Sequence, residues 1–329
     1  MANAGDWLIL HGGALGDLAL TIQFALRLPG VGAASVLRVI SRVGPGDFAA
    51  CAPRVERVSA DGLPLHWLFE TGTAAGGRAG SSGAVPAPSR AAAPARLREL
   101  IGGWNVLNAL TGPDTGAHDR LVSLGPRTLC TLDTRPDPGS SRHITEQWAA
   151  RLRGQARLGA RGQRLRLAPP ASEFTADRRV DVLIHPGSGG RAKCWPLDRF
   201  VAAGQALLDA GRSVRFLVGP VELDLWSERR LSDLRERFPL LECSDAGALG
   251  AALAACRVFL SNDCGPAHVA ALLGRPTVTL FGPTSPDVWR PLSRAGQALR
   301  GDVALGPEWG LAPGVVAGVV ASALDATPT

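Results

Sequence analysis

Three short segments of the chain combine small residues with charged or polar side chains in a way that could bind an anion. The first is Ser261–His268, in which Asp263 is followed by the step Gly265-Pro266. A Gly-Pro step that opens a helix leaves backbone N–H groups at the positive end of the helix dipole. We therefore predict a phosphate site here. A second interpretation, compatible with the first, is that Asp263 caps the helix.

The second segment, His185–Pro196, contains the four small residues Gly187–Gly190 and, three positions later, Lys193. Small residues let the backbone approach a phosphate closely, Ser188 can donate a hydrogen bond, and Lys193 can pair with the charge. Lys193 is the only lysine of the sequence, whereas arginines are abundant. The spacing differs from the Walker motif, but the pattern still favours phosphate binding over an ordinary turn with an exposed lysine.

The third segment is Gly16-Asp17, a carboxylate in a glycine-containing loop at the first turn of a predicted helix. One interpretation is a general base placed at a cleft. The other is a negative charge that stabilises a helix N-terminus. The residues alone do not decide between them.

Each of these segments lies between an apolar strand and a helical stretch, and such alternation is typical of an α/β fold. We expect strands at 7–10, 36–40, 104–110, 128–132, 180–184, 214–218, 257–260 and 277–281. We expect helices over 18–28, 143–152, 197–210, 246–256 and 267–273, and another that Glu222 opens. In an open sheet of this kind ligands bind at the carboxyl ends of the strands.

The length of 329 residues fits two domains, which we place at 1–165 and 166–329. Residues 71–95 are rich in Gly, Ala, Ser and Pro and predict a flexible loop in the first domain, while 154–177 predicts a linker. The apolar segment Val315–Leu324 predicts a last, packed helix, with the N-terminal domain as one candidate surface.

Composition further limits the classes of protein to which the chain can belong. The hydrophobic fraction of 46% indicates a globular chain, and the net charge of +6 suits an anionic ligand or membrane surface without indicating nucleic-acid binding. The six cysteines form no CxxC pair, which favours reduced thiols and a cytoplasmic location. No leader-like start and no apolar run of bilayer length are present.

Several enzyme classes are disfavoured by missing motifs. A dinucleotide fingerprint would need glycine at position 11, which is His11, and no acidic residue closes the second strand, so an oxidoreductase stays only a rival hypothesis. There is no zinc spacing, no Asp-x-Asp pair after a strand, and no Gly-x-Ser-x-Gly elbow. We therefore expect no metal and no cofactor.

Taken together, the three segments resemble glycosyltransferase family 9, the heptosyltransferases of lipopolysaccharide core assembly. The resemblance is strongest in two long patterns of the second half, His185–Pro196 and Asn262–Trp289. The latter includes Asn262–Ala271, Gly274-Arg275-Pro276 and Phe281–Thr284. In the first half only Gly13–Asp17 and Thr21 match well.

The resemblance implies a GT-B-like fold, with two Rossmann-like domains whose parallel sheets face a central cleft. It implies an inverting, metal-independent transfer of a sugar, heptose in the family, from a nucleoside-diphosphate sugar such as ADP-heptose to a hydroxyl of a glycan or lipid-linked acceptor. Asp17 would be the base, with Gly13 and Gly16 in its loop, and Lys193 would act on the diphosphate. The implied donor-binding residues are Ser188, Gly189, Lys193, Glu222, Asp263, Gly265, Pro266, Ala267 and His268.

Two departures from the family pattern stand beside the match: Cys264 where many members have Ser or Thr, and Gln23 where a proline is usual. The first half, which would select the acceptor, is the more divergent part. Peripheral contact with the inner membrane would suit a lipid acceptor. The alternative function is a catalytically degenerate homologue that binds nucleotide sugars without transferring them.

Overall fold

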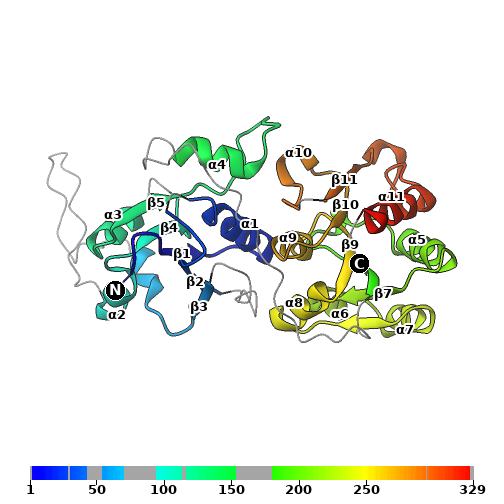
Figure 1. Ribbon diagram of the computed structural model, residues 1–329, viewed down its shortest axis with the longest axis horizontal. Coiled ribbons are helices and arrows are strands. Elements are labelled where there is room, and N and C mark those ends of the chain that lie inside the picture. The colour runs from blue at the N-terminus through cyan, green and yellow to red at the C-terminus, as the bar shows by residue number, and fades with distance from the viewer. Residues whose placement is uncertain are drawn as a thin grey trace, which may run out of the picture.

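The computed structural model describes residues 2–28, 30–42, 54–69, 94–112, 116–152, 180–293 and 295–326, and every structural statement below concerns these residues. They form two α/β units that lie side by side (Figure 1). Of the predicted loop 71–95, only residues 94 and 95 are described, and helix α2 begins there at Ala95. The predicted linker 154–177 and the predicted domain boundary lie outside the described residues.

The N-terminal unit is a five-stranded parallel sheet in the order β3-β2-β1-β4-β5. Its central strand is fully buried, as expected for an apolar run that helices cover on both faces. The strands are β1 Trp7–His11, β2 Val36–Ser41, β3 Arg54–Ser59, β4 Asn105–Ala109 and β5 Thr128–Thr131. The helices are α1 Leu15–Ala25, α2 Ala95–Ile101, α3 Gly116–Ser123 and α4 Ile144–Leu152.

The C-terminal unit is a six-stranded parallel sheet in the order β11-β10-β9-β6-β7-β8. Its strands are β6 Val180–His185, β7 Val214–Val218, β8 Leu240–Glu242, β9 Cys256–Asn262, β10 Thr277–Phe281 and β11 Gln297–Arg300. Its helices are α5 Leu197–Asp209, α6 Pro220–Leu225, α7 Glu228–Arg237, α8 Ala246–Ala254, α9 Gly265–Leu272, α10 Pro286–Trp289 and α11 Pro313–Asp325. The predicted pair of parallel-sheet, Rossmann-like units is thus confirmed.

The strand order reverses direction at one place in each sheet. In the N-terminal unit this switch point lies between β1 and β4, and in the C-terminal unit it lies between β9 and β6. Loops that leave two such strands turn to opposite sides, which opens a crevice at the carboxyl ends. Helix α1 starts at the first switch point and α9 at the second.

Helices α1 and α9 pack against each other and join the two units, as the centre of Figure 1 shows. One buried apolar cluster contains Leu18 and Ile22 of α1 together with Val269 of α9. Two side chains of the N-terminal unit also reach backbone carbonyls beyond α10: Gln23 Nε2 lies 3.5 Å from the oxygen of Leu292, and His143 Nε2 lies 3.0 Å from that of Arg290. The contact between the two units thus consists mainly of apolar side chains, with these two polar contacts beside them.

The last helix, α11, packs on the C-terminal unit. It lies against α5, β9 and β10, and Val316 and Val320 are fully buried in the same cluster as Phe200 of α5. The apolar face of this helix thus covers the C-terminal sheet, and the hypothesis that the helix also packs on the N-terminal domain stays a prediction. Among the described residues, no helix is both long and apolar enough to cross a membrane.

Candidate functional site

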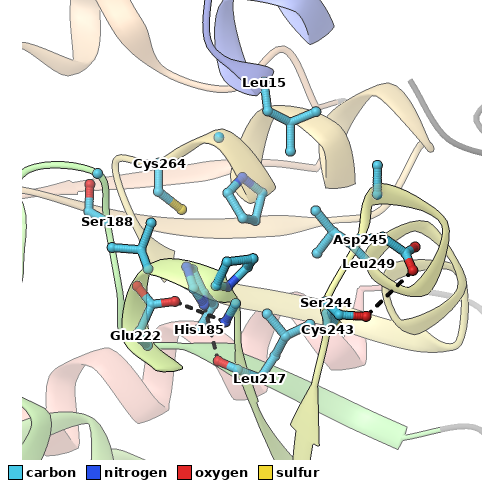
Figure 2. Close-up of a pocket in the computed structure, with 17 residues that line it drawn as sticks. Leu15, His185, Ser188, Leu217, Glu222, Cys243, Ser244, Asp245, Leu249 and Cys264 are labelled. Atoms are coloured by element: carbon cyan, nitrogen blue, oxygen red, sulfur yellow. Dashed lines mark hydrogen bonds between the residues drawn. The ribbon is translucent and has the colours of Figure 1, made fainter. Parts of the chain in front are cut away.

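A cavity of about 310 Å³ lies at the carboxyl ends of the neighbouring strands β9, β6, β7 and β8 (Figure 2). Its wall is formed by the residues that follow each strand: Ser188 and Gly189 after β6, Pro220–Glu222 after β7, Cys243–Ala246 after β8, and Cys264–Pro266 after β9. Its volume lies in the range of small-ligand sites. The cavity therefore occupies the crevice that the strand order of the C-terminal sheet opens.

The N-terminal unit contributes Leu15 to the wall of this cavity, and Figure 2 shows the side chain reaching toward it from α1. The contact is close because two glycines face each other at the crossing of α1 and α9. A Cβ atom built on Gly16 would lie 3.1 Å from the Cα of Gly265, and one built on Gly265 would lie 3.2 Å from the backbone N of Gly16. Both distances are shorter than ordinary van der Waals contacts, so a side chain at either glycine would crowd the other helix.

Asp263 is the charged centre beside the cavity. Its side chain is only 7% exposed, and Oδ2 lies 2.9 Å from Nζ of Lys193 and accepts a 2.8 Å hydrogen bond from Thr284 Oγ1. Lys193 ends a 3-10 turn, Arg191–Lys193, in the loop after β6, and Thr284 lies in the loop after β10. A buried carboxylate needs such partners to stay charged. The two loops thus converge on the residue that follows β9.

Asn262 ties the loop after β6 to the end of β9. Its Oδ1 accepts a hydrogen bond from the Trp195 amide at 2.9 Å, and its Nδ2 donates to the Pro186 carbonyl at 2.9 Å. Ser188 adds a third link, because its hydroxyl donates to the Asp263 carbonyl at 3.0 Å. Ser188 lines the cavity while making this bond, so its role in the free protein is to fix the loop.

Glu222 lines the cavity from the first turn of α6 and is 4% exposed. Its Oε2 accepts a hydrogen bond from the Gly219 amide at 2.9 Å, which caps the helix. Its carboxylate also lies where a side chain on Gly187 would be, because a Cβ atom there would come within 3 Å of Oε1, Cδ and Cγ of Glu222. The loop after β6 therefore has glycine at 187 to make room for this carboxylate.

We expect Gly187→Ala to displace Glu222 and to weaken binding of whatever ligand contacts that carboxylate by about tenfold, because a well-packed loop accommodates an extra methyl only by moving. Gly318→Ala is the matched control: Gly318 is exposed on α11, outside the cavity wall, and a Cβ atom there would meet no atom within 4 Å. Ligand affinity measured by titration calorimetry decides the point. Equal affinities of the two variants would contradict the steric assignment.

Asp17 lies in the first turn of α1, close enough to the two charged residues of the other unit to be affected by both. Burial is the main influence and raises the pKa of the carboxyl above its usual range, and the Asp263 carboxylate acts in the same direction. A hydrogen bond with the backbone of Ala14 and the charge of Lys193 act in the opposite direction. A carboxylate with a raised pKa is a better proton acceptor than an ordinary aspartate.

The raised pKa predicts two pH effects. If Asp17 acts as a base, activity should be lost as pH falls through a value above 3.8, since the carboxyl becomes protonated there.

The second effect concerns stability, and its pH dependence has the opposite sign to that of a salt-bridged aspartate. Above pH 3.8 the buried charge costs stability, so Asp17→Asn should raise the melting temperature at pH 7. Thermal melts at pH 7 of both proteins test this, and a lower melting temperature for the variant would contradict it.

Three histidines near the strand ends are kept neutral by burial. The pKa of His268 falls to about 4, that of His11 also falls to about 4, and that of His185 is lowered. His268 Nε2 is 3.9 Å from Asp263 Oδ1, beyond hydrogen-bond distance, and Nδ1 has no partner among the described residues. These side chains can accept or donate a hydrogen bond at neutral pH, but they bring no positive charge to the site.

The structure places the predicted residues in three groups. Ser188, Gly189, Glu222, Gly265 and Pro266 line the cavity. Lys193, Asp263 and His268 lie beside it around the Asp263 carboxylate, and Asp17, Gly13 and Gly16 approach from the other unit. Ala267 is fully buried, and its amide donates to the Cys264 carbonyl at 3.2 Å; its place in the donor site stays a prediction.

Sequence reasoning missed part of the wall. Leu15, His185, Leu217, Cys243–Ala246 and Leu249 line the cavity but were not predicted as site residues. Thr284 was noted in a motif but not as the hydrogen-bond donor to Asp263. The signal that could have found the Cys243–Ala246 stretch is its place immediately after a strand of the same sheet, but that strand, β8, has only three residues.

Two parallel α/β units with a cavity at the strand ends of the second, closed by the first, define the GT-B class of fold. The sequence model of glycosyltransferase family 9 (heptosyltransferase) matches residues 140–309, more than half of the 329 residues. The chain belongs to this family. The match covers the whole cavity wall of the C-terminal unit and leaves out the segment that carries Asp17.

Relatives with known roles match over shorter stretches. Lipopolysaccharide heptosyltransferase 3 of Escherichia coli is 31% identical over 136 residues, which cover 38% of this chain and 40% of the relative. Lipopolysaccharide heptosyltransferase 2 of Escherichia coli K12 is 35% identical over 118 residues, or 34% and 33% of the two chains. The chain thus matches between a third and two fifths of the length of these relatives.

Solved structures match over the full length. A glycosyl transferase family 9 protein from Veillonella parvula has a TM-score of 0.67 at 17% identity, with 99% of each chain covered. The Escherichia coli ADP-heptose lps heptosyltransferase II has a TM-score of 0.61 at 18% identity, with 98% of this chain and 99% of the other covered. At these identities the likeness concerns the fold.

Proposed function

We propose that the protein is an inverting, metal-independent glycosyltransferase that moves heptose from ADP-heptose to a hydroxyl of a lipopolysaccharide-core or related glycan acceptor. One observation carries the proposal: a cavity of about 310 Å³ at the switch point of the C-terminal sheet lies next to the Lys193–Asp263 pair, and Asp17 of the other unit lies close enough to feel both charges. A donor site and a candidate base therefore meet at one place.

In the proposed reaction the nucleobase of the donor occupies the cavity and the ribose lies near Glu222. The diphosphate lies near Ser188, Gly265 and Lys193. An acceptor hydroxyl attacks the anomeric carbon as Asp17 takes its proton. The new C–O bond forms on the face opposite the bond to the β-phosphate, which breaks and leaves its electron pair on ADP. A single displacement of this kind inverts the anomeric centre.

The residues beside the cavity suit the charge that develops in this step. As the bond to phosphate breaks, negative charge grows on the leaving oxygen. The Lys193 ammonium and the positive end of α9, which begins at Gly265, can stabilise it without a divalent cation. Each well-placed donor of this kind contributes on the order of 3 kcal/mol. Activity that persists in excess EDTA is therefore expected.

The comparisons support the choice of donor. The family description and the named relatives are heptosyltransferases, and a fold neighbour of 17% identity, the Escherichia coli heptosyltransferase WaaC, has been solved with ADP. Under the proposal, the C-terminal unit is the donor domain and the N-terminal unit, with the Gly13–Asp17 loop, is the acceptor domain. The protein would act in the cytoplasm, with peripheral contact at the inner membrane when the acceptor is a lipid.

The decisive experiment combines binding and turnover. A thermal-shift screen of nucleoside diphosphates and their sugars should show the largest stabilisation by ADP and ADP-heptose. Mass spectrometry should then detect transfer of heptose from ADP-heptose to a lipid A–Kdo core acceptor. Binding without transfer or donor hydrolysis would support the degenerate homologue instead. Stabilisation by NAD(P)H with no response to ADP would contradict the transferase assignment.

A further inference from the structure

Trp309 has an unusual backbone conformation for a bulky residue. Its φ of 56° makes it the one non-glycine residue with positive φ among the residues that the structure describes, and it is only 4% exposed. Such a conformation is strained and persists only where the surroundings enforce it. Trp309 lies after the 3-10 turn Val303–Leu305 and is not part of the cavity wall. The reason for this strained backbone conformation must therefore lie outside the cavity wall.

The indole ring of Trp309 lies directly on Gly282. A Cβ atom built on Gly282 would come within 2.6 Å of three ring atoms, so the ring occupies the space of the missing side chain. Two backbone hydrogen bonds link the end of β10 to Trp309 through residues 301 and 302. The Gly301 amide donates to Phe281 O at 2.8 Å, and the Asp302 amide donates to Trp309 O at 2.8 Å. Trp309 thus supports the turn that carries Thr284.

The residue before Trp309 supports the other loop. The carbonyl of Glu308 accepts a 3.0 Å hydrogen bond from Trp195 Nε1, and Trp195 is 1% exposed. Trp195 is two residues after Lys193, and its own amide donates to Asn262 Oδ1. The dipeptide 308–309 therefore contacts both loops that bring a side chain to the Asp263 carboxylate, one through a hydrogen bond and the other through the ring.

We propose that Trp309 is a positioning residue of the donor site, which holds the Lys193 and Thr284 loops in the register that lets both side chains bind Asp263 Oδ2. The inference rests on the proposed function in one respect, namely that Lys193 acts on the donor diphosphate. Without the ring, the turn at Gly282 loses its support, and the Glu308 carbonyl that accepts the hydrogen bond from Trp195 Nε1 is no longer held against that turn. Lys193 and Asp263 then separate more often, and the ammonium is less well placed for the phosphate.

The test is a double-mutant cycle on ADP affinity, measured by titration calorimetry. Trp309→Leu should raise the Kd about fivefold in the wild-type background and leave it nearly unchanged in the Lys193→Gln background, as coupled residues do. Trp309→Phe should restore part of the affinity.

Gly282→Ala, which pushes on the ring without removing it, should weaken ADP binding in the same way. Trp104→Phe, a buried indole of the N-terminal unit, is the control for lost packing. An equal loss in both Lys193 backgrounds would overturn the proposal.

A second measurement does not depend on the nucleotide. Because Lys193 is the single lysine, limiting acetic anhydride labels one ε-amine, which mass spectrometry reads after proteolysis. Trp309→Leu should raise the rate of labelling about threefold, as expected when a partly exposed ion pair opens more often. An unchanged rate would overturn the positioning role. Faster labelling in a protein whose wild type does not bind ADP would retain that role and reject the proposed donor.

Discussion

Asp17→Asn is expected to lower the turnover of heptose transfer by roughly 100- to 10,000-fold, the usual contribution of a positioned general base. The amide keeps the shape of the side chain and cannot accept the proton of the acceptor hydroxyl. Affinity for ADP should change little, because Asp17 does not line the cavity in which we propose that the nucleotide binds. Steady-state kinetics with ADP-heptose, together with calorimetry of ADP, separate the two effects.

The matched control for this substitution is Asp61→Asn, which removes a carboxylate from an exposed turn of the same unit. It should leave both turnover and ADP affinity unchanged. Full turnover of the Asp17→Asn protein would show that another group takes the proton. A parallel loss of turnover and ADP affinity would mean that the carboxylate acts on the donor instead.

The second large effect is expected from Lys193→Ala. The substitution removes the cation that would stabilise charge on the leaving diphosphate, and kcat/KM should fall by roughly 100-fold. It also leaves the Asp263 carboxylate, 7% exposed, with Thr284 as its hydrogen-bond donor among the described residues, so that its negative charge lies uncompensated next to the phosphates of the proposed donor. ADP affinity should therefore fall together with turnover, unlike the result for Asp17→Asn.

Two variants frame the Lys193 measurement. Lys193→Arg keeps the charge but not the compact ammonium, and should retain an intermediate activity. Arg96→Ala removes a positive charge from an exposed ion pair with Glu99 on α2, at the far side of the N-terminal unit (Figure 1), and should have no effect. If Arg96→Ala and Lys193→Ala reduced kcat/KM equally, overall charge rather than the site would be responsible.

The sequence predicted the inner strands and missed three of the outer ones. Strands such as β1, β6 and β9 are covered on both sides, so they are runs of apolar residues that stand out in any window. The missed strands β3, β8 and β11 each lie at the edge of a sheet. Their sequences, RVERVS, LLE and QALR, are short or rich in polar residues, because one side of an edge strand faces water.

The same cause explains which site residues could be predicted. Ser188 and Gly265 follow inner strands, and the glycine and charge patterns after those strands indicated a phosphate site. Glu222 also follows an inner strand, but only the family resemblance indicated it as a site residue. The Cys243–Ala246 stretch follows edge strand β8 and carried no such signal. Leu15 could not be assigned to the cavity wall from sequence, because its place there depends on how α1 and α9 cross. Contacts between residues about 250 positions apart leave no mark in local spacing.

The position of Leu15 and the apolar joint beneath it also limit how the molecule can be dissected. A fragment cut between the two units would lose one wall of the cavity and would expose Val269 and its neighbours on α9 to solvent. Large exposed apolar patches promote aggregation. Studies of the C-terminal unit therefore require the intact chain, and a truncated protein that fails to bind a ligand would report on its lost neighbour rather than on its own loops.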